Sequence, residues 1–145
     1  MSDKIKEILS KYKTIAMVGV SKNETKTSTI VMKYMQKYGF RVIPVNPSAK
    51  GEEILGEEVF EKLEDIKTPV DIVDVFRPSV EAFKYAEETT KIGAKVLWLQ
   101  LGIKSPEAKK MLEAKDIYYI ENRCTKMEYQ KIFLKMNPAF PVLQD

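Results

Sequence analysis

The chain contains no histidine and only one cysteine, Cys124, among its 145 residues. The absence of histidine excludes a Ser-His-Asp triad, a histidine-ligated metal and a phosphohistidine intermediate. A single cysteine excludes an internal disulfide and a cysteine-rich metal site. An enzyme of this composition would therefore have to work with carboxylates, lysines, hydroxyl groups or one thiol.

Long apolar runs and a strong charge of one sign are also missing. No apolar segment approaches the length that crosses a membrane, and the stretch from Met1 to Lys13 is too charged for a signal peptide. We therefore expect a cytoplasmic protein without a membrane partner. The net charge of +3 is modest. No basic run is interleaved with aromatic residues, which argues against nucleic acid as a partner.

The residues that are present have a globular composition, with 44% apolar and 31% charged residues. Five apolar runs rich in β-branched residues predict buried strands. None alternates strictly between polar and apolar residues, which is typical of parallel strands covered on both faces. The runs are Thr14–Val20, Arg41–Asn46, Val70–Phe76, Lys95–Leu101 and Ile117–Glu121.

Amphipathic segments between these runs predict helices. They are expected near Asp3–Tyr12, before Gly39, near Gly56–Glu64, between Ser79 and Gly93, after Ser105-Pro106 and from Thr125 onward. Ser79 and Ser105 are expected N-caps, and Thr125 with Glu128 fits a capping box. The alternation of strands and helices predicts a Rossmann-like, doubly wound parallel sheet of five strands, with helices on both faces, in a single domain over residues 1–145.

In an open parallel sheet a ligand binds at the carboxyl ends of the strands, near the point where the strand order reverses. The loop after the first predicted strand departs from the G-x-G-x-x-G fingerprint of dinucleotide sites, because its three positions hold Gly19, Ser21 and Glu24. The second strand ends in Asn46, where an NAD site has an acid for the ribose. Both departures argue against an ordinary NAD site. The missing glycines also argue against a P-loop nucleotidase.

What remains of this loop suits a diphosphate. Gly19 allows the backbone to turn tightly out of the strand. The hydroxyl groups of Ser21, Thr27 and Ser28, together with Lys26, surround the start of the next predicted helix. Free N–H groups at a helix N-terminus attract anions. The alternative interpretation is a plain solvated turn.

Two of the three arginines, Arg77 and Arg123, directly follow predicted strands on the ligand side. A guanidinium group holds phosphate better than an ammonium group does. Lys50, after the second strand, is a third candidate for a phosphate contact. The alternative is that each arginine pairs with a neighbouring carboxylate.

Three further residues lie where chemistry is conceivable. Asp71 and Asp74 are three apart on one strand and so point to opposite faces, which predicts structural hydrogen bonds rather than a shared metal ion. Cys124 precedes a predicted helix start, where the helix dipole lowers the pKa of a thiol. It is either a reactive thiolate, able to form a mixed disulfide with a ligand thiol, or a small buried residue.

Taken together, these loops resemble those of the small CoA-binding proteins of the YccU-like family. The Rossmann-type domain of that family is similar to the N-terminal part of the succinyl-CoA synthetase alpha subunit. The matching stretches include "IAMVGVSKN", "PVDIVDVFRPS" and "ENRCTKMEY", and the similarity covers nearly the whole chain. The family usually has proline near the positions where this chain has Lys22, Glu24 and Thr27.

The resemblance implies a coenzyme A site built from these loops. The residues implied for the diphosphate are Gly19, Val20, Ser21, Lys26 and Ser28. Those implied for the adenosine side are Val45, Asn46, Pro47, Lys50, Val75, Phe76 and Arg77. Those implied to close the pocket toward the pantetheine arm are Gln100, Gly102, Asn122 and Arg123. CoA carries a diphosphate and a 3′-phosphate, which accounts for the additional cationic groups.

We therefore expect a non-catalytic module that binds CoA or an acyl-CoA as its small-molecule ligand. Ligases of the resembled family need a phosphorylated histidine and further domains, so stand-alone ligase activity is not expected of this chain. An NAD(P)-binding regulatory domain and a thiol-redox partner of CoA through Cys124 are the alternatives. The tail "NPAFPVLQD" packs either on the body or on a second subunit, which leaves a homodimer or a partner enzyme subunit open.

Overall fold

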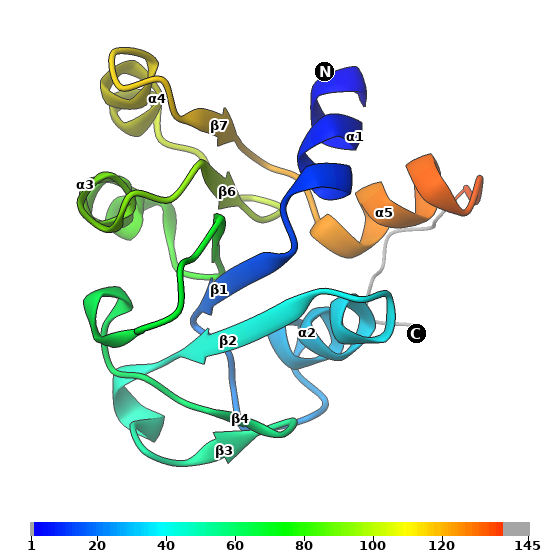
Figure 1. Cartoon of the computed structure of the whole chain (residues 1–145), viewed down its shortest axis with the longest axis vertical. Coiled ribbons are helices and arrows are strands. Elements are labelled where there is room, and N and C mark those ends of the chain that lie inside the picture. The colour runs from blue at the N-terminus through cyan, green and yellow to red at the C-terminus, as the bar shows by residue number, and fades with distance from the viewer. Residues whose placement is uncertain (1, 138–145) are drawn as a thin grey trace.

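Five parallel strands form the central sheet of the computed structural model, which describes residues 2–137 (Figure 1). Their order is β2-β1-β5-β6-β7. The strands are β1 (Thr14–Val18), β2 (Arg41–Val45), β5 (Ile72–Val75), β6 (Val96–Leu99) and β7 (Tyr118–Ile120). The chain runs from β1 outward to β2 and then crosses to β5 on the other side of β1. The Rossmann-like, doubly wound sheet predicted from the sequence is therefore confirmed.

Helices cover both faces of this sheet (Figure 1). One face carries α1 (Ser2–Lys11), α2 (Thr27–Lys37) and α5 (Thr125–Phe133), and the other carries α3 (Ala82–Ile92) and α4 (Pro106–Glu113). A small antiparallel hairpin, β3 (Glu53–Ile54) and β4 (Glu57–Glu58), lies beside β2. Short 3-10 helices span Pro47–Ala49, Leu63–Asp65 and Ser79–Glu81. Among the helices of residues 2–137, none has the length and apolar character needed to cross a membrane.

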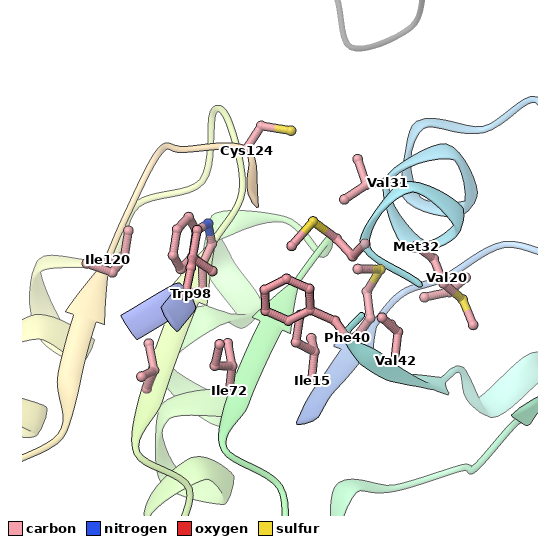
Figure 2. Packing of buried hydrophobic residues seen from close by; sticks show 14 of the residues in the cluster. Ile15, Val20, Val31, Met32, Phe40, Val42, Ile72, Trp98, Ile120 and Cys124 are labelled. Carbon is pink, nitrogen blue, oxygen red and sulfur yellow. The ribbon is translucent and has the colours of Figure 1, made fainter. Parts of the chain in front are cut away.

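Two apolar clusters, one on each face, hold the layers together. On the face of α2, Figure 2 shows Ile15, Ile72 and Trp98 side by side on the sheet, with Val31 above them. Trp98 is fully buried, and its indole N–H donates a hydrogen bond to a backbone carbonyl in the loop after β7 at 2.8 Å. The bond satisfies the one polar atom of this side chain, so its large apolar surface contributes fully to the core.

The prediction of a short helix near Gly56–Glu64 is wrong. This segment instead contains the turn and second strand of the β3–β4 hairpin and the start of a 3-10 helix. Leu55 and Gly56 have φ angles of 48° and 85°, which turn the chain back instead of continuing a helix. The backbone N–H of Phe60 then donates to the carbonyl of Pro44 in β2. A pairing with the sheet therefore replaces the helical hydrogen bonds.

Two expected helix caps are also wrong, whereas a third is confirmed. The hydroxyl of Ser79 accepts a hydrogen bond from the backbone N–H of Lys104 and does not cap α3. The N-cap of α5 is Cys124, and Thr125 already lies inside the helix, so the capping box does not form. Ser105 caps α4, because its Oγ accepts a hydrogen bond from a first-turn N–H at 3.1 Å. The two expectations for the tail fall on residues 138–145, outside the described range.

Replacing Ser105 by alanine should lower the free energy of unfolding by about 1 kcal/mol, because α4 loses its N-cap hydrogen bond. Urea denaturation followed by circular dichroism measures this change. Ser10→Ala, at an exposed position of α1, is the control and should stay within about 0.5 kcal/mol of the wild type. Equal stability of both variants would show that the Ser105 cap contributes nothing.

Candidate functional site

The loops after β1 and β5 touch at the point where the strand order reverses. Gly19, directly after β1, has a φ of +91°, and a Cβ at this position would lie 2.8 Å from the carbonyl oxygen of Phe76. It would also lie 3.1 Å from Cδ of Arg77. Only glycine accepts both the backbone conformation and this approach. The structure therefore brings three of the predicted site residues together at the crevice expected for a doubly wound sheet.

The first loop, residues 19–26, is shaped by side chains that accept backbone hydrogen bonds. Ser28 Oγ accepts from the N–H of Ser21 at 3.1 Å, and Ser21 Oγ accepts from the N–H of Asn23 at 3.0 Å. Asn23 Oδ1 accepts from both the N–H and the hydroxyl of Thr25. The loop ends at Lys26, the N-cap of α2, which provides no side-chain cap. The first N–H groups of α2 are therefore available to an anion in the crevice.

Asn46 links the first loop to the loop after β2. Its Nδ2 donates a hydrogen bond to the carbonyl of Val20 at 2.8 Å. Its Oδ1 accepts hydrogen bonds from the N–H and the hydroxyl of Ser48, at 3.0 and 2.8 Å. An ionised carboxylate here could not donate to Val20. The departure from the NAD pattern thus has a structural reason, and Asn46 positions the site through its side chain.

Several predicted site residues direct their side chains into the core. Those that are 3% exposed or less are Val20, Val45, Val75 and Gln100. A ligand at the strand ends could reach them through backbone atoms, whereas their side chains pack inside. Pro47, Lys50, Arg77, Gly102 and Asn122, in contrast, are exposed.

Three of the cationic side chains predicted for phosphate, Lys50, Arg77 and Arg123, have carboxylate neighbours. Arg77 forms a bidentate pair with Glu81, in which Nη2 and Oε2 are 2.7 Å apart. The hydrogen bond from Arg77 lowers the pKa of Glu81. The other two pairs are Lys50–Glu61 at 3.3 Å and Arg123–Glu128 at 3.5 Å. The alternative in which each arginine pairs with a carboxylate is therefore what the structure shows. The spacing of four residues between Arg77 and Glu81 was a signal for this pair that the sequence analysis missed.

The loops after β6 and β7 are joined at the far end of the site. Asn122 has a φ of 56°, and its Oδ1 accepts a hydrogen bond from the N–H of Gly102 at 2.7 Å. The N–H of Arg123 donates to the carbonyl of Leu99 at 3.2 Å. Gly102, Asn122 and Arg123, which were predicted for the pantetheine side, thus lie together after two neighbouring strands.

Pockets lie at both ends of the row of loops that follow the strands. A pocket of about 440 Å³ near β7 is lined by Lys104, Lys109, Tyr119, Glu121, Asn122 and Arg123. A pocket of about 380 Å³ at the β2 end includes Val45 and Pro47. A third pocket, of about 600 Å³, lies between α2 and Leu55 and contains none of the predicted site residues. The candidate site lies at the strand ends, where the contact of the two loops at Gly19 meets the N-terminus of α2.

A buried carboxyl group lies beneath the site. Asp74 is completely buried, and its Oδ1 accepts a hydrogen bond from Gln100 at 2.6 Å, while Oδ2 accepts one from the hydroxyl of Thr125 at 3.4 Å. Burial raises the pKa of Asp74 to about 7. Asp71 accepts a hydrogen bond from the N–H of Thr14. The structural role predicted for both aspartates is confirmed. The hydrogen bond from the hydroxyl of Thr125 to Asp74 was not predicted.

Cys124 is 2% exposed although it is the N-cap of α5. Burial raises the pKa of its thiol to about 11, opposite to the effect expected from the helix dipole. The thiolate interpretation is therefore wrong for this structure. The alternative of a small buried residue is confirmed.

Comparisons with known proteins agree with this geometry. A family model described as a CoA binding domain matches residues 13–130. The chain is 42% identical over 125 residues to YneT of Bacillus subtilis (strain 168), an uncharacterized protein, covering 86% of this chain and 91% of YneT. A structure described as cell-free ID.343 from Thermus thermophilus is 38% identical with a TM-score of 0.87, covering 92% of this chain and 99% of that chain. An 87-residue match to the ADP-forming acetate–CoA ligase of Methanocaldococcus jannaschii is 30% identical and covers 60% of this chain but 12% of the ligase.

Gly19→Ala should destabilise the protein by about 1–3 kcal/mol more than Gly56→Ala does, because the added Cβ overpacks against Phe76. Gly56 is the matched control, since its φ of +85° imposes the same backbone penalty while nothing lies within 4 Å of its Cβ position. Urea denaturation of both variants gives the difference. Equal losses would contradict the close contact of the two loops.

Asp74→Asn should remove a pH dependence of stability. The folded-state pKa of Asp74 is about 7 against an ordinary value of 3.8, so between these values the folded chain holds a proton that the unfolded chain has released. The free energy of unfolding of the wild type therefore falls by a few kcal/mol as pH rises from about 4 through 7. Denaturation curves from pH 4 to 8 should show this fall relative to Asp74→Asn. A constant difference between the two proteins across that range would contradict the raised pKa.

Proposed function

The chain belongs to the CoA-binding domain family, and we propose that it binds coenzyme A or an acyl-CoA at the strand ends, acting as one domain without catalysing a reaction alone. The observation that carries this proposal is the contact of Gly19 with Phe76 and Arg77 beside the uncapped N-terminus of α2. Doubly wound sheets hold the diphosphate of their ligands at this position.

The ligand lies across the row of loops in this proposal. Its diphosphate faces Gly19, Ser21 and the first turn of α2. The adenosine extends toward the end of β2, where Lys50 offers a cation for the 3′-phosphate. The pantetheine arm extends the other way, across the end of β6 toward Asn122. The pockets at both ends of the row support this path.

A phosphate group replaces Glu81 as the partner of Arg77. The side chains of this pair are 46% and 32% exposed, and exposed pairs contribute about 1 kcal/mol or less to stability. The exchange therefore costs little, while a doubly or singly charged phosphate accepts the same bidentate hydrogen bonds. The pair keeps Arg77 extended beside the crevice before the ligand arrives.

The absence of histidine excludes a phosphohistidine step within this chain. The acetate–CoA ligase that the chain resembles is matched over only 12% of its length. We therefore assign any acyl-transfer step to a partner chain and the retention of the CoA group to this one.

Arg77→Ala should weaken CoA binding about 10- to 100-fold, as expected for the loss of a hydrogen bond between two charged groups, whereas Arg123→Ala, on the uncharged pantetheine side, should have a smaller effect. Isothermal titration with CoA, acetyl-CoA, NAD and ATP measures the affinities, after native mass spectrometry has shown what the purified protein carries. Arg41→Ala is the matched control, because Arg41 begins β2 at the opposite ends of the strands and pairs with Glu57.

Unchanged affinity of Arg77→Ala would mean that the phosphates lie elsewhere. Binding of NAD without binding of CoA would overturn the proposed function and would favour a dinucleotide-binding regulatory domain.

A further inference from the structure

Two exposed apolar side chains lie on the neighbouring loops after β5 and β6, beside the proposed pantetheine path. Within residues 2–137, the large apolar side chains with high exposure are Val80 at 89%, Leu101 at 38% and Met136 at 48%. Val80 lies in the 3-10 helix after β5, and Leu101 lies in the loop after β6, separated from the strand by Gln100. Two of these three side chains thus stand on neighbouring loops at the same edge of the sheet.

The two loops are fixed to each other. Strands β5 and β6 pair in parallel, with Val75 opposite Leu99. Beyond the strands, the hydroxyl of Ser79 accepts a hydrogen bond from the N–H of Lys104 at 3.0 Å. Val80 and Leu101 are therefore displayed from a rigid frame, although burial of both side chains would be favourable.

The proposed ligand path leads to this place. Neighbouring strands are about 4.8 Å apart, so the end of β6 lies roughly 10 Å from the diphosphate position at the end of β1. A pantetheine arm is longer than this distance. Its sulfur, and any acyl group on it, therefore reaches the loop that carries Leu101.

We propose that Val80 and Leu101 form an apolar platform for the acyl group, so that the ligand class is an acyl-CoA with an apolar acyl chain of several carbons. The inference rests on the proposed function, because it needs CoA at the strand ends. It adds the class of acyl group that the ligand carries. The contact covers two apolar side chains that water otherwise surrounds.

Titration with CoA, acetyl-CoA, butanoyl-CoA and hexanoyl-CoA tests the platform. Full burial of one methylene raises affinity about fourfold, and a platform that covers one side of the chain should give about half of that free energy. We therefore expect the dissociation constant to fall about twofold per methylene, or roughly fourfold from butanoyl-CoA to hexanoyl-CoA.

The double variant Val80→Ser, Leu101→Gln should lose this dependence on chain length. Met136→Gln is the matched control, since Met136 is an exposed apolar residue beyond the end of α5, and it should keep the full dependence. The ratio of the dissociation constants for CoA and hexanoyl-CoA is compared within each variant. Thermal unfolding verifies that each variant is folded.

Each outcome decides a separate point. Binding of CoA with no dependence on chain length would overturn the platform and leave the proposed function standing. The exposed pair would then be a surface for a protein partner. Dependence on chain length that survives in the double variant would place the acyl group elsewhere. Failure of the wild type to bind any CoA compound would overturn the proposed function and this inference with it.

Discussion

The approach of Gly19 to the backbone of Phe76, where an added Cβ would lie 2.8 Å from the carbonyl oxygen, is the constraint on which the site depends. The chain leaves β1 toward α2 on one face of the sheet and leaves β5 toward α3 on the other (Figure 1). Two adjacent loops that diverge in this way open a crevice between them. The missing side chain lets the two loops meet at its floor, so a ligand bound as proposed would lie against backbone rather than mobile side chains.

Polar side chains shape the first loop, in which Ser21 occupies a position where dinucleotide-binding loops have glycine. Ser21, Asn23 and Ser28 accept backbone hydrogen bonds within the loop, and Asn46 holds the carbonyl of Val20. Each of these groups is committed to the loop and is thereby less available as a specific contact for a base or a ribose. In the proposed site, recognition would then fall mainly on the helix N-terminus and the cations, which suits a ligand rich in phosphate.

The strands and most helices were predictable because continuous apolar runs and helix-period patterns carry them. The proposed position of the site rests on topology alone. The hydrogen-bond partners of individual side chains could not be predicted in this way. The bonds of Asn46 to Val20 and of Gln100 to Asp74 each join residues 26 positions apart. The hairpin after β2 was missed for a related reason, because its turn uses a non-glycine residue at positive φ, Leu55.

The buried Asp74 network links the two ends of the proposed pantetheine path. Gln100 directly precedes Leu101, and Thr125 begins α5 two residues after Arg123. One carboxyl group therefore joins the segment after β6 to the start of α5. A pKa near 7 for that carboxyl means that the network changes charge close to neutral pH. The hydrogen bonds from Gln100 and Thr125 stabilise the charged form of the carboxyl and partly offset the effect of burial on its pKa.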